Sequence, residues 1–178
     1  MWISKRVLIS GTVALVAAMS MALAVGAIAH RGGGDRGGHG QRGDHGKALL
    51  DESLAPSVPT DPAFHGVSPG GAPWVLKRGD VQLKRNRLEL RVRGLVIPTA
   101  PGNGTPGPVT TISASLYCGA DSNATAADTT DQFPIDSRGN ARIKDRSFAT
   151  PDTCLAPVIL VHPNGDATHY IALEGWRP

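Results

Sequence analysis

The sequence predicts an all-β protein, an antiparallel immunoglobulin-like β-sandwich with one disulfide, and a barrel is the alternative arrangement. Three observations support this fold class. Apolar and polar residues alternate with a period of two through much of the C-terminal half of the chain. Turn-forming pairs such as Asn164-Gly165 separate the alternating segments. No segment between residues 73 and 178 shows the 3.6-residue apolar stripe of an amphipathic helix.

The first hairpin is predicted over residues 80–93. A two-residue loop at Arg85-Asn86 pairs Leu83 with Leu88 and places the apolar residues of both strands on one face. Asn86 tolerates the positive φ that such a loop needs. The register and the alternation therefore agree on a hairpin with one buried face.

The last hairpin is predicted around Asn164-Gly165, because this pair is a strong short-range hairpin signal. A two-residue loop there makes His162 and His169 diagonal neighbours on one face, within reach of a shared metal ion. Hydrogen-bonded structural histidines are the alternative interpretation. The full set of predicted strands is 73–77, 80–84, 87–93, 95–98, 110–118, 141–148, 157–162 and 167–173.

The two cysteines of the chain, Cys118 and Cys154, predict a disulfide. A pair of cysteines in an exported protein is most simply oxidised. The bond would close a loop of about 36 residues and stabilise the fold by about 3–4 kcal/mol in the chain-entropy model. Two free buried thiols are the alternative. A zinc site is not indicated, because the paired CxxC spacing that such sites favour is missing.

The N-terminus predicts export. Lys5 and Arg6 precede the uncharged segment 7–29, which ends in Ala27-Ile28-Ala29, a small-x-small pattern typical of signal-peptide cleavage. A retained transmembrane anchor is the alternative, because a span needs about 20 apolar residues. Either reading makes residues 1–29 a signal peptide or anchor and places the rest outside the cytoplasm, secreted or tethered to the outer face of the membrane.

Residues 30–72 are predicted to be a flexible linker, and residues 73–178 the β-sandwich domain. Glycine makes up about half of the segment 30–46, which has no apolar residue. His30, His39 and His45 lie in this segment and provide imidazole ligands for a weak metal site. A linker without metal is the alternative.

Several short segments resemble small uncharacterised exported β-sandwich proteins of high-GC bacteria. The resemblance covers about residues 80–178, through Gly94-Leu95-Val96-Ile97-Pro98, Ala114-Ser115-Leu116-Tyr117-Cys118, Tyr170-Ile171-Ala172 and the stretch from Cys154 to Val161. It implies export and a β-sandwich. It assigns no catalytic or ligand-binding residue.

The net charge of +3 falls to about +1 without Lys5 and Arg6, because 16 basic residues then oppose 15 acidic ones. Bulk charge therefore gives no reason to expect nucleic acid as a partner. Locally, Lys84, Arg87, Arg91 and Arg93 are predicted to project from one side of the first hairpin. An anionic membrane surface or a cell-envelope polymer would dock on such a face, unless the acidic residues of the loop after residue 118 neutralise it.

Motifs for catalysis are missing from the sequence. It contains no Gly-x-Ser-x-Gly, no HExxH and no Gly-rich phosphate loop before a helix. We therefore expect no catalytic residue and no cofactor. The predicted function is an exported, non-enzymatic binding or structural module, with a secreted hydrolase carrying a loop-borne active site as the alternative.

Overall fold

The computed structural model describes residues 47–120 and 125–175, which form strands and no helix. The signal peptide or anchor, residues 1–29, and the Gly-rich segment 30–46 lie outside the described residues. The described strands, in chain order, are β1 (Leu50–Pro56), β2 (Ser68–Pro69), β3 (Arg78–Lys84), β4 (Arg87–Arg93), β5 (Thr111–Tyr117), β6 (Asp128–Thr129), β7 (Phe133–Pro134), β8 (Ala141–Asp145), β9 (Val158–Pro163), β10 (His169–Tyr170) and β11 (Ala172–Glu174).

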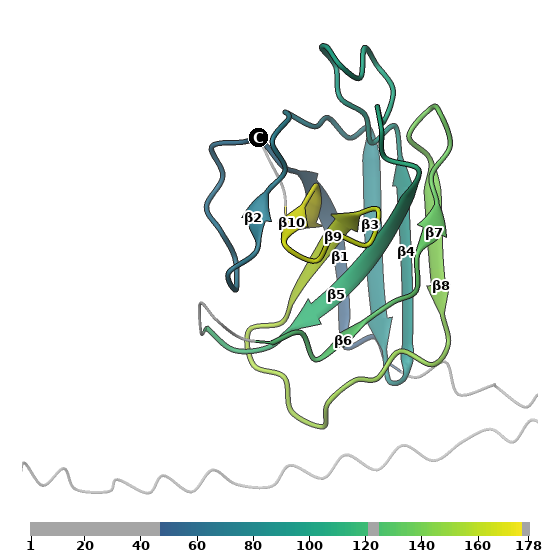
Figure 1. Cartoon of the computed structure of the whole chain (residues 1–178). Helices are drawn as coiled ribbons and strands as arrows, with labels where there is room; N and C mark the ends of the chain where they lie inside the picture. Colours follow the sequence, from purple (N-terminus) through teal and green to yellow (C-terminus); the bar gives the residue numbers. More distant parts are fainter. Residues whose placement is uncertain (1–46, 121–124, 176–178) are drawn as a thin grey trace, which may run out of the picture. The chain divides into compact units, whose positions relative to one another are not determined.

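Nine of the described strands form one antiparallel sheet, in the order β6-β5-β9-β11-β1-β3-β4-β8, and β7 also pairs with β5. Strand β1 joins two halves of this sheet. Its first residues, Leu50–Ser53, pair with β3, and its last, Leu54–Pro56, pair with β11. The sheet curls, so that β5 crosses in front of β3 and β4 in Figure 1. We call β3, β4 and β8 the first limb, and β5, β9 and β11 the second limb.

The main core lies between the two limbs. Leu88, Leu90 and Val92 of β4 face inward from the first limb, and Ile112 and Leu116 of β5 do so from the second. All of these side chains are almost fully buried. Alternate residues of each strand therefore supply the core, as the period of two predicts. The all-β class is confirmed, and the strands run through one curled antiparallel sheet.

The first hairpin forms in the predicted register. Leu83 pairs with Leu88, and Lys84 pairs with Arg87 across a two-residue loop. Asn86 has a φ of 55°, the positive value that this loop requires. The structure extends β3 back to Arg78.

The linker prediction is wrong for the described residues from 47 to 72. Strand β1 lies within this range and pairs on both sides, with β3 and β11. Its alternation is interrupted: Leu50 is buried, residues 51–53 are exposed, and Leu54 and Ala55 are buried in succession. The interruption falls where the strand changes partners, so a search for a period of two misses the strand.

Residues 57–71 cover the outer face of the second limb and build a second, smaller core. It contains Val67, Tyr117, Leu160 and Tyr170. The ring of Phe64 meets Tyr170 edge-on at 5.9 Å, and the hydroxyl of Tyr170 donates to the carbonyl of Pro62. Strand β2 in this segment pairs with β10 as a separate two-stranded parallel sheet. The covering segment is therefore an ordered layer of the fold.

The last hairpin keeps its predicted turn but not its predicted register. Asn164 and Gly165 both have positive φ, and the N–H of Asp166 donates to the carbonyl of Pro163. Beyond the turn, His169 and Tyr170 leave the hairpin to pair with β2. The ladder resumes with Ala172 opposite Val161, so His169 does not lie opposite Leu160.

Two further predicted strands are wrong as regular elements. The segments 73–77 and 95–98 meet only through an isolated bridge between Val75 and Val96. Trp74 is nevertheless buried, and its backbone N–H donates to the carbonyl of Ser57. Outside that bridge these segments are irregular, and they contribute Trp74, Leu95 and Ile97 to the main core.

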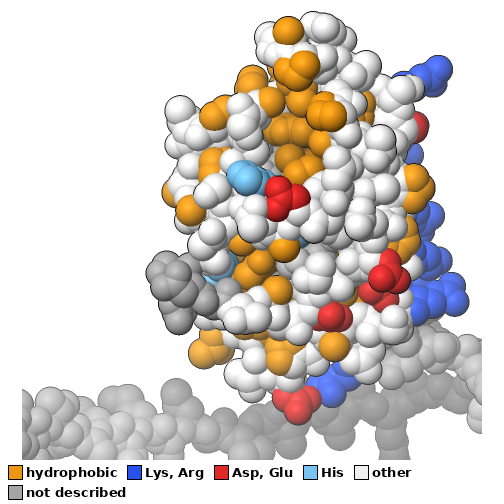
Figure 2. All heavy atoms as spheres, viewed as in Figure 1, with side chains coloured by type: hydrophobic (Ala, Val, Ile, Leu, Met, Phe, Trp, Pro, Cys, Tyr) orange, Lys and Arg blue, Asp and Glu red, His pale blue; other side chains and the backbone are white. Residues whose placement is uncertain are grey.

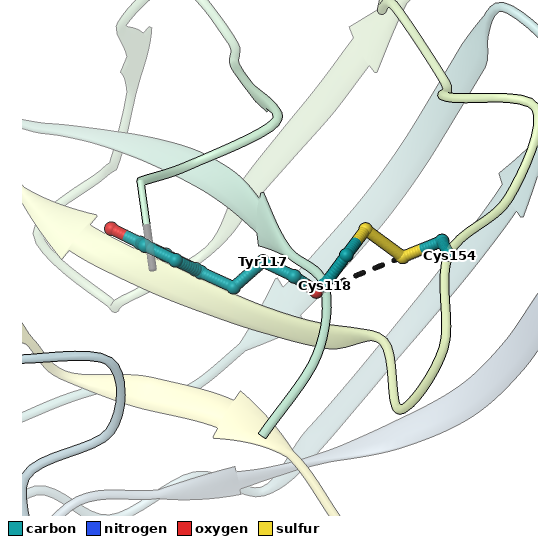
Figure 3. The surroundings of a disulfide bond; sticks show 3 residues. All are labelled: Tyr117, Cys118 and Cys154. Atoms are coloured by element: carbon teal, nitrogen blue, oxygen red, sulfur yellow. Dashed lines mark hydrogen bonds between the residues drawn. A yellow bond between two sulfur atoms is a disulfide. The ribbon is translucent and has the colours of Figure 1, made fainter. Parts of the chain in front are cut away.

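The predicted disulfide between Cys118 and Cys154 is confirmed (Figure 3). Cys118 directly follows β5, and Cys154 lies in the segment that leads into β9. The Cα atoms are 5.0 Å apart, and Sγ of Cys154 lies 3.8 Å from the carbonyl oxygen of Tyr117. The bond therefore ties one end of β5 to the approach of its neighbour in the second limb.

Candidate functional site

The outer face of the first limb carries a dense group of cations. Alternation along β3, β4 and β8 points every second residue away from the core. Figure 2 shows Lys and Arg side chains along the edge where β4 and β8 are drawn in Figure 1. We call this surface the basic face, and its members are Arg78, Lys84, Arg87, Arg91, Arg93, Arg142 and Lys144.

Four of these residues, Lys84, Arg87, Arg91 and Arg93, were predicted from the sequence to share one side of the hairpin, and they do. Their binding of an anionic partner stays a prediction. Arg142 and Lys144 of β8 were missed. The alternation of β8 would have shown that both point outward, but no local signal shows that β8 pairs with β4.

Among the described residues, two carboxylates of the first limb share the basic face, and both are already engaged. A third, Asp51 of the neighbouring strand β1, borders the face and accepts from the side chain of Gln82 at 3.0 Å. Asp80 accepts from Arg78 at 3.0 Å, and this contact raises the pKa of the arginine. Glu89 contacts Arg87 closely and Arg142 at 3.5 Å. Partial burial alone would raise the pKa of Glu89, but the neighbouring cations outweigh burial and lower it.

Arg91 and Arg93 keep their charge uncompensated. Both side chains are exposed, and no carboxylate of the described residues lies within 4.0 Å of either. In the ladder Arg91 stands opposite Arg142, and Arg93 stands opposite Arg78. Like charges in directly opposed positions repel, so both pairs lower the stability of the folded state.

Acidic residues after Cys118 were expected to compete for these cations. Two of the described ones, Asp128 and Asp136, bond to other groups. Asp128 accepts from its own neighbour Thr129 and from Ala149, and Asp136 accepts from the backbone of Arg138 and Asn140. Neither forms an ion pair with the basic face among the described residues. Asp121 lies outside the described residues.

The histidines predicted as metal ligands divide into two groups. His30, His39 and His45 lie outside the described residues. His162 is fully buried, its Nδ1 lies 2.8 Å from the carbonyl oxygen of His169, and burial lowers its pKa. The part of the chain that the structure describes holds no group of three or more His, Cys, Asp or Glu side chains placed for a metal ion.

His169 forms the arrangement closest to an acid–base pair. Its Nδ1 lies 2.8 Å from a carboxylate oxygen of Asp166. Hydrogen bonds from Thr168 and His169 lower the pKa of Asp166 to about 2. The hydroxyl of Thr168 also approaches Nδ1, at 3.0 Å, so it sits on the carboxylate side of the ring. A nucleophile would need to face Nε2, and among the described residues no side chain bonds there.

An apolar hollow of about 290 Å³ adjoins this pair. Trp74, Ile97, Val109 and Ile171 line it, and Asp166 and His169 also border it. Burial of an apolar ligand portion is what such a surface provides. The described residues add no hydrogen-bonded nucleophile to the hollow, and both cysteines are held in the disulfide.

Comparisons of the chain with protein-family models, with curated proteins and with solved structures find no match. Because the described residues form no helix, none of their segments is a helix suited to cross a membrane.

Proposed function

We propose that this chain is an exported, non-enzymatic binding module that attaches to an anionic polymer of the cell envelope through the basic face. The observation that carries the proposal is the set of seven cations on three adjacent strands. The described carboxylates beside them are Asp80 and Glu89, which are already paired with arginines, and Asp51 of β1, which is bonded to Gln82. Such a field attracts polyanions and holds them by ion pairs.

Export rests on the N-terminal pattern and the disulfide. Lys5 and Arg6 precede the uncharged segment that ends at Ala29, a signal-peptide pattern. A disulfide persists in oxidising compartments outside the cytoplasm. The resemblance to small exported β-sandwich proteins of high-GC bacteria agrees with both. Cleavage after Ala29 would release the module to reach the envelope.

A polymer is favoured over a lipid surface by the composition of the basic face. Peripheral membrane proteins combine cations with apolar side chains that enter the headgroup region. The exposed large hydrophobic residues of the described chain are Leu49, Val75 and Leu155, and none of them belongs to β3, β4 or β8. The basic face therefore offers ion pairing without insertion.

Co-sedimentation of the purified full chain with washed cell-wall material tests the proposal. We expect retention at 0.1 M salt, where the Debye length is about 10 Å, and release at 1 M, where it is about 3 Å. Vesicles of anionic phospholipid form the second arm. Retention on vesicles without retention on wall material would identify a lipid surface and contradict the polymer proposal.

A matched pair of triple variants locates the contact. Arg91→Ser, Arg93→Ser and Lys144→Ser together remove three exposed cations from the basic face and should abolish retention. Arg85→Ser, Arg138→Ser and Arg146→Ser remove three exposed cations that lie outside the face and should retain it. Equal loss in both variants would assign binding to net charge and overturn the assignment to this face.

A secreted hydrolase is the second candidate, and the Asp166–His169 pair beside the apolar hollow is the observation that favours it. The carboxylate fixes the orientation of the imidazole, as a general base requires. Turnover of a panel of ester, peptide and glycan substrates, abolished by His169→Ala, would establish an enzyme. No turnover above that of His169→Ala would exclude this use of the pair.

A further inference from the structure

A surface hollow of about 590 Å³ lies on the basic face between β4 and β8. Arg91 and Arg93 border it from β4, and Asn140 and Arg142 border it from the β7–β8 turn and β8. Arg91 and Arg142 are direct cross-strand partners, so their Cα atoms are about 4.5–5.5 Å apart. Arg93 follows two residues along β4, about 7 Å away. Three arginine side chains are therefore attached at neighbouring backbone positions around one hollow.

The cations around the hollow outnumber the anions available to them. Arg142 shares Glu89 with Arg87, at the longer distance of 3.5 Å. Arg91 stands opposite Asp80 on its other side, but Asp80 accepts two hydrogen bonds from Arg78. Arg93 stands opposite another arginine, Arg78. An anion entering the hollow would compensate charges that the protein leaves uncompensated.

The scaffold under the hollow is fixed by a closed set of hydrogen bonds. Asp136 accepts from the backbone of Arg138 and from both the backbone and the side chain of Asn140. The side-chain oxygen of Asn140 in turn accepts from the N–H of Gly94, directly after β4. Gly139 has a φ of 75°, and a Cβ there would collide with the Leu95 backbone. The arginines thus project from strands that the turn holds together.

We infer that this hollow is a phosphate-binding site, formed by Arg91, Arg93 and Arg142. The inference rests on the proposed function and names the anionic group of the polymer, a phosphate group. A single carboxylate is satisfied by one bidentate arginine. A phosphate presents more terminal oxygens and up to about two negative charges, which suits several guanidinium forks around one position.

An NMR titration of the purified full chain with inorganic phosphate tests the site directly. The Nε–Hε signals of Arg91, Arg93 and Arg142 should shift together and saturate. A parallel titration with acetate at the same ionic strength should leave them nearly unshifted. Equal shifts with acetate, or no shift with phosphate, would overturn the inference.

The matched variants are two double substitutions that remove the same charge. Arg91→Gln with Arg142→Gln should weaken phosphate binding at least about tenfold, because each removes a charged hydrogen-bond donor. Arg85→Gln with Arg146→Gln removes two exposed arginines outside the hollow and should change the affinity less than about twofold. If both double variants bound phosphate equally weakly, the attraction would come from the overall charge of the protein, which would contradict a defined site.

Competition separates the sources of the phosphate group. Polyphosphate that displaces inorganic phosphate supports a polymer ligand, and vesicles of anionic phospholipid that do so identify a lipid headgroup. The two proposals also fail separately. Retention on wall material without phosphate-dependent shifts would overturn the site and leave the proposed function standing. Saturable phosphate binding without retention on wall material would support the site and overturn the proposed function.

Discussion

The two limbs of the sheet share one core, but their outer faces differ in whether another segment of the chain covers them. The outer face of β5 and β9 is buried beneath residues 57–71, which pack Phe64 and Val67 against it. Among the residues that the structure describes, no such layer covers the outer face of β3, β4 and β8, which carries the seven cations of the basic face. Covering these cations would desolvate them at a cost of several kcal/mol each. The chain therefore covers the face that carries serine, leucine and tyrosine and leaves the charged face exposed.

This difference places the second core in one half of the sheet and the proposed binding surface on the other. The covered half contains the second core, the disulfide and the buried His162. The exposed half contributes its inward residues to the main core, while its outward residues bury little apolar area. Substitutions on the two outer faces should therefore affect different measurements.

The largest effect is expected at Tyr170, which is fully buried in the second core. Tyr170→Ala should lower the free energy of unfolding by about 3–5 kcal/mol, because it removes an aromatic ring and leaves a cavity under residues 57–71. Urea denaturation of the full chain measures this change. Tyr170→Phe is the control: it removes the hydrogen bond to Pro62 and should cost only about 1 kcal/mol.

A loss below about 1 kcal/mol in Tyr170→Ala would contradict the assignment of residues 57–71 to the folded domain. Removal of residues 1–46 gives the complementary comparison, since the covering layer begins after that segment. If residues 57–71 are a structural layer, the truncated chain should unfold at the same urea concentration as the full chain.

The disulfide should give the next largest effect. Cys118→Ala with Cys154→Ala should lower the free energy of unfolding by about 3–4 kcal/mol, because the unfolded chain regains the freedom of a 36-residue loop. The Tm with and without a reducing agent measures the change. The double variant should be insensitive to the reductant. A parent protein equally insensitive, with two thiols open to alkylation, would contradict the bond.

Glu174 of β11 should make stability depend on pH. Burial is the main cause that raises its pKa to about 7; a backbone hydrogen bond with Ile159 lowers the pKa, and the charge of Glu52 raises it. The folded state therefore keeps the proton to higher pH than the unfolded state, whose carboxyl titrates near 4.5. By linkage, stability is greatest below the unfolded pKa and is lost as pH rises toward the folded one.

Glu174→Gln should remove that loss. At pH 8 the variant should be more stable than the parent by about 1 kcal/mol, because the side chain is partly exposed and solvent screens part of the effect. The Tm from pH 4 to pH 8 measures both curves. Glu52→Gln, which removes only the repulsion, should give a smaller gain. A parent curve that stays flat from pH 5 to pH 8 would show that Glu174 titrates normally.

The sequence was most informative where neighbours in the chain are neighbours in the sheet. The first hairpin has its register set by the adjacent loop at Asn86, so alternation and turn chemistry were sufficient to predict it. The disulfide followed from a count of two cysteines. The basic residues of β3 and β4 followed from the same local alternation.

The errors lie where pairing is distant or interrupted. β1 changes partners in its middle, which breaks its alternation, and both partners are distant in sequence. β8 pairs with β4 across about 50 residues, so Arg142 could not be placed opposite Arg91. Residues 57–71 cover a face through aromatic contacts with Tyr117 and Tyr170. This segment contains Pro59, Pro62 and Pro69, and proline marks irregular backbone without showing whether that backbone packs.

The smallest stability effect, and the one that sharpens the comparison most, is expected where Arg91 and Arg142 oppose each other across β4 and β8. Arg91→Ser and Arg142→Ser, made singly and together, should change the free energy of unfolding by less than about 0.5 kcal/mol each. Like charges in opposed positions repel by about 0.2–1 kcal/mol, so either single substitution relieves the whole repulsion. The sum of the two single-variant changes in the free energy of unfolding should therefore exceed, on the stabilising side, the change in the double variant. This difference should vanish in 1 M salt, which screens the repulsion. Arg85→Ser and Arg146→Ser, which lie in the β3–β4 turn and just after β8, should give additive effects at every salt concentration. Additive effects for the Arg91–Arg142 pair at low salt would show that their guanidinium groups point apart, and an anion could not then bridge them in the hollow.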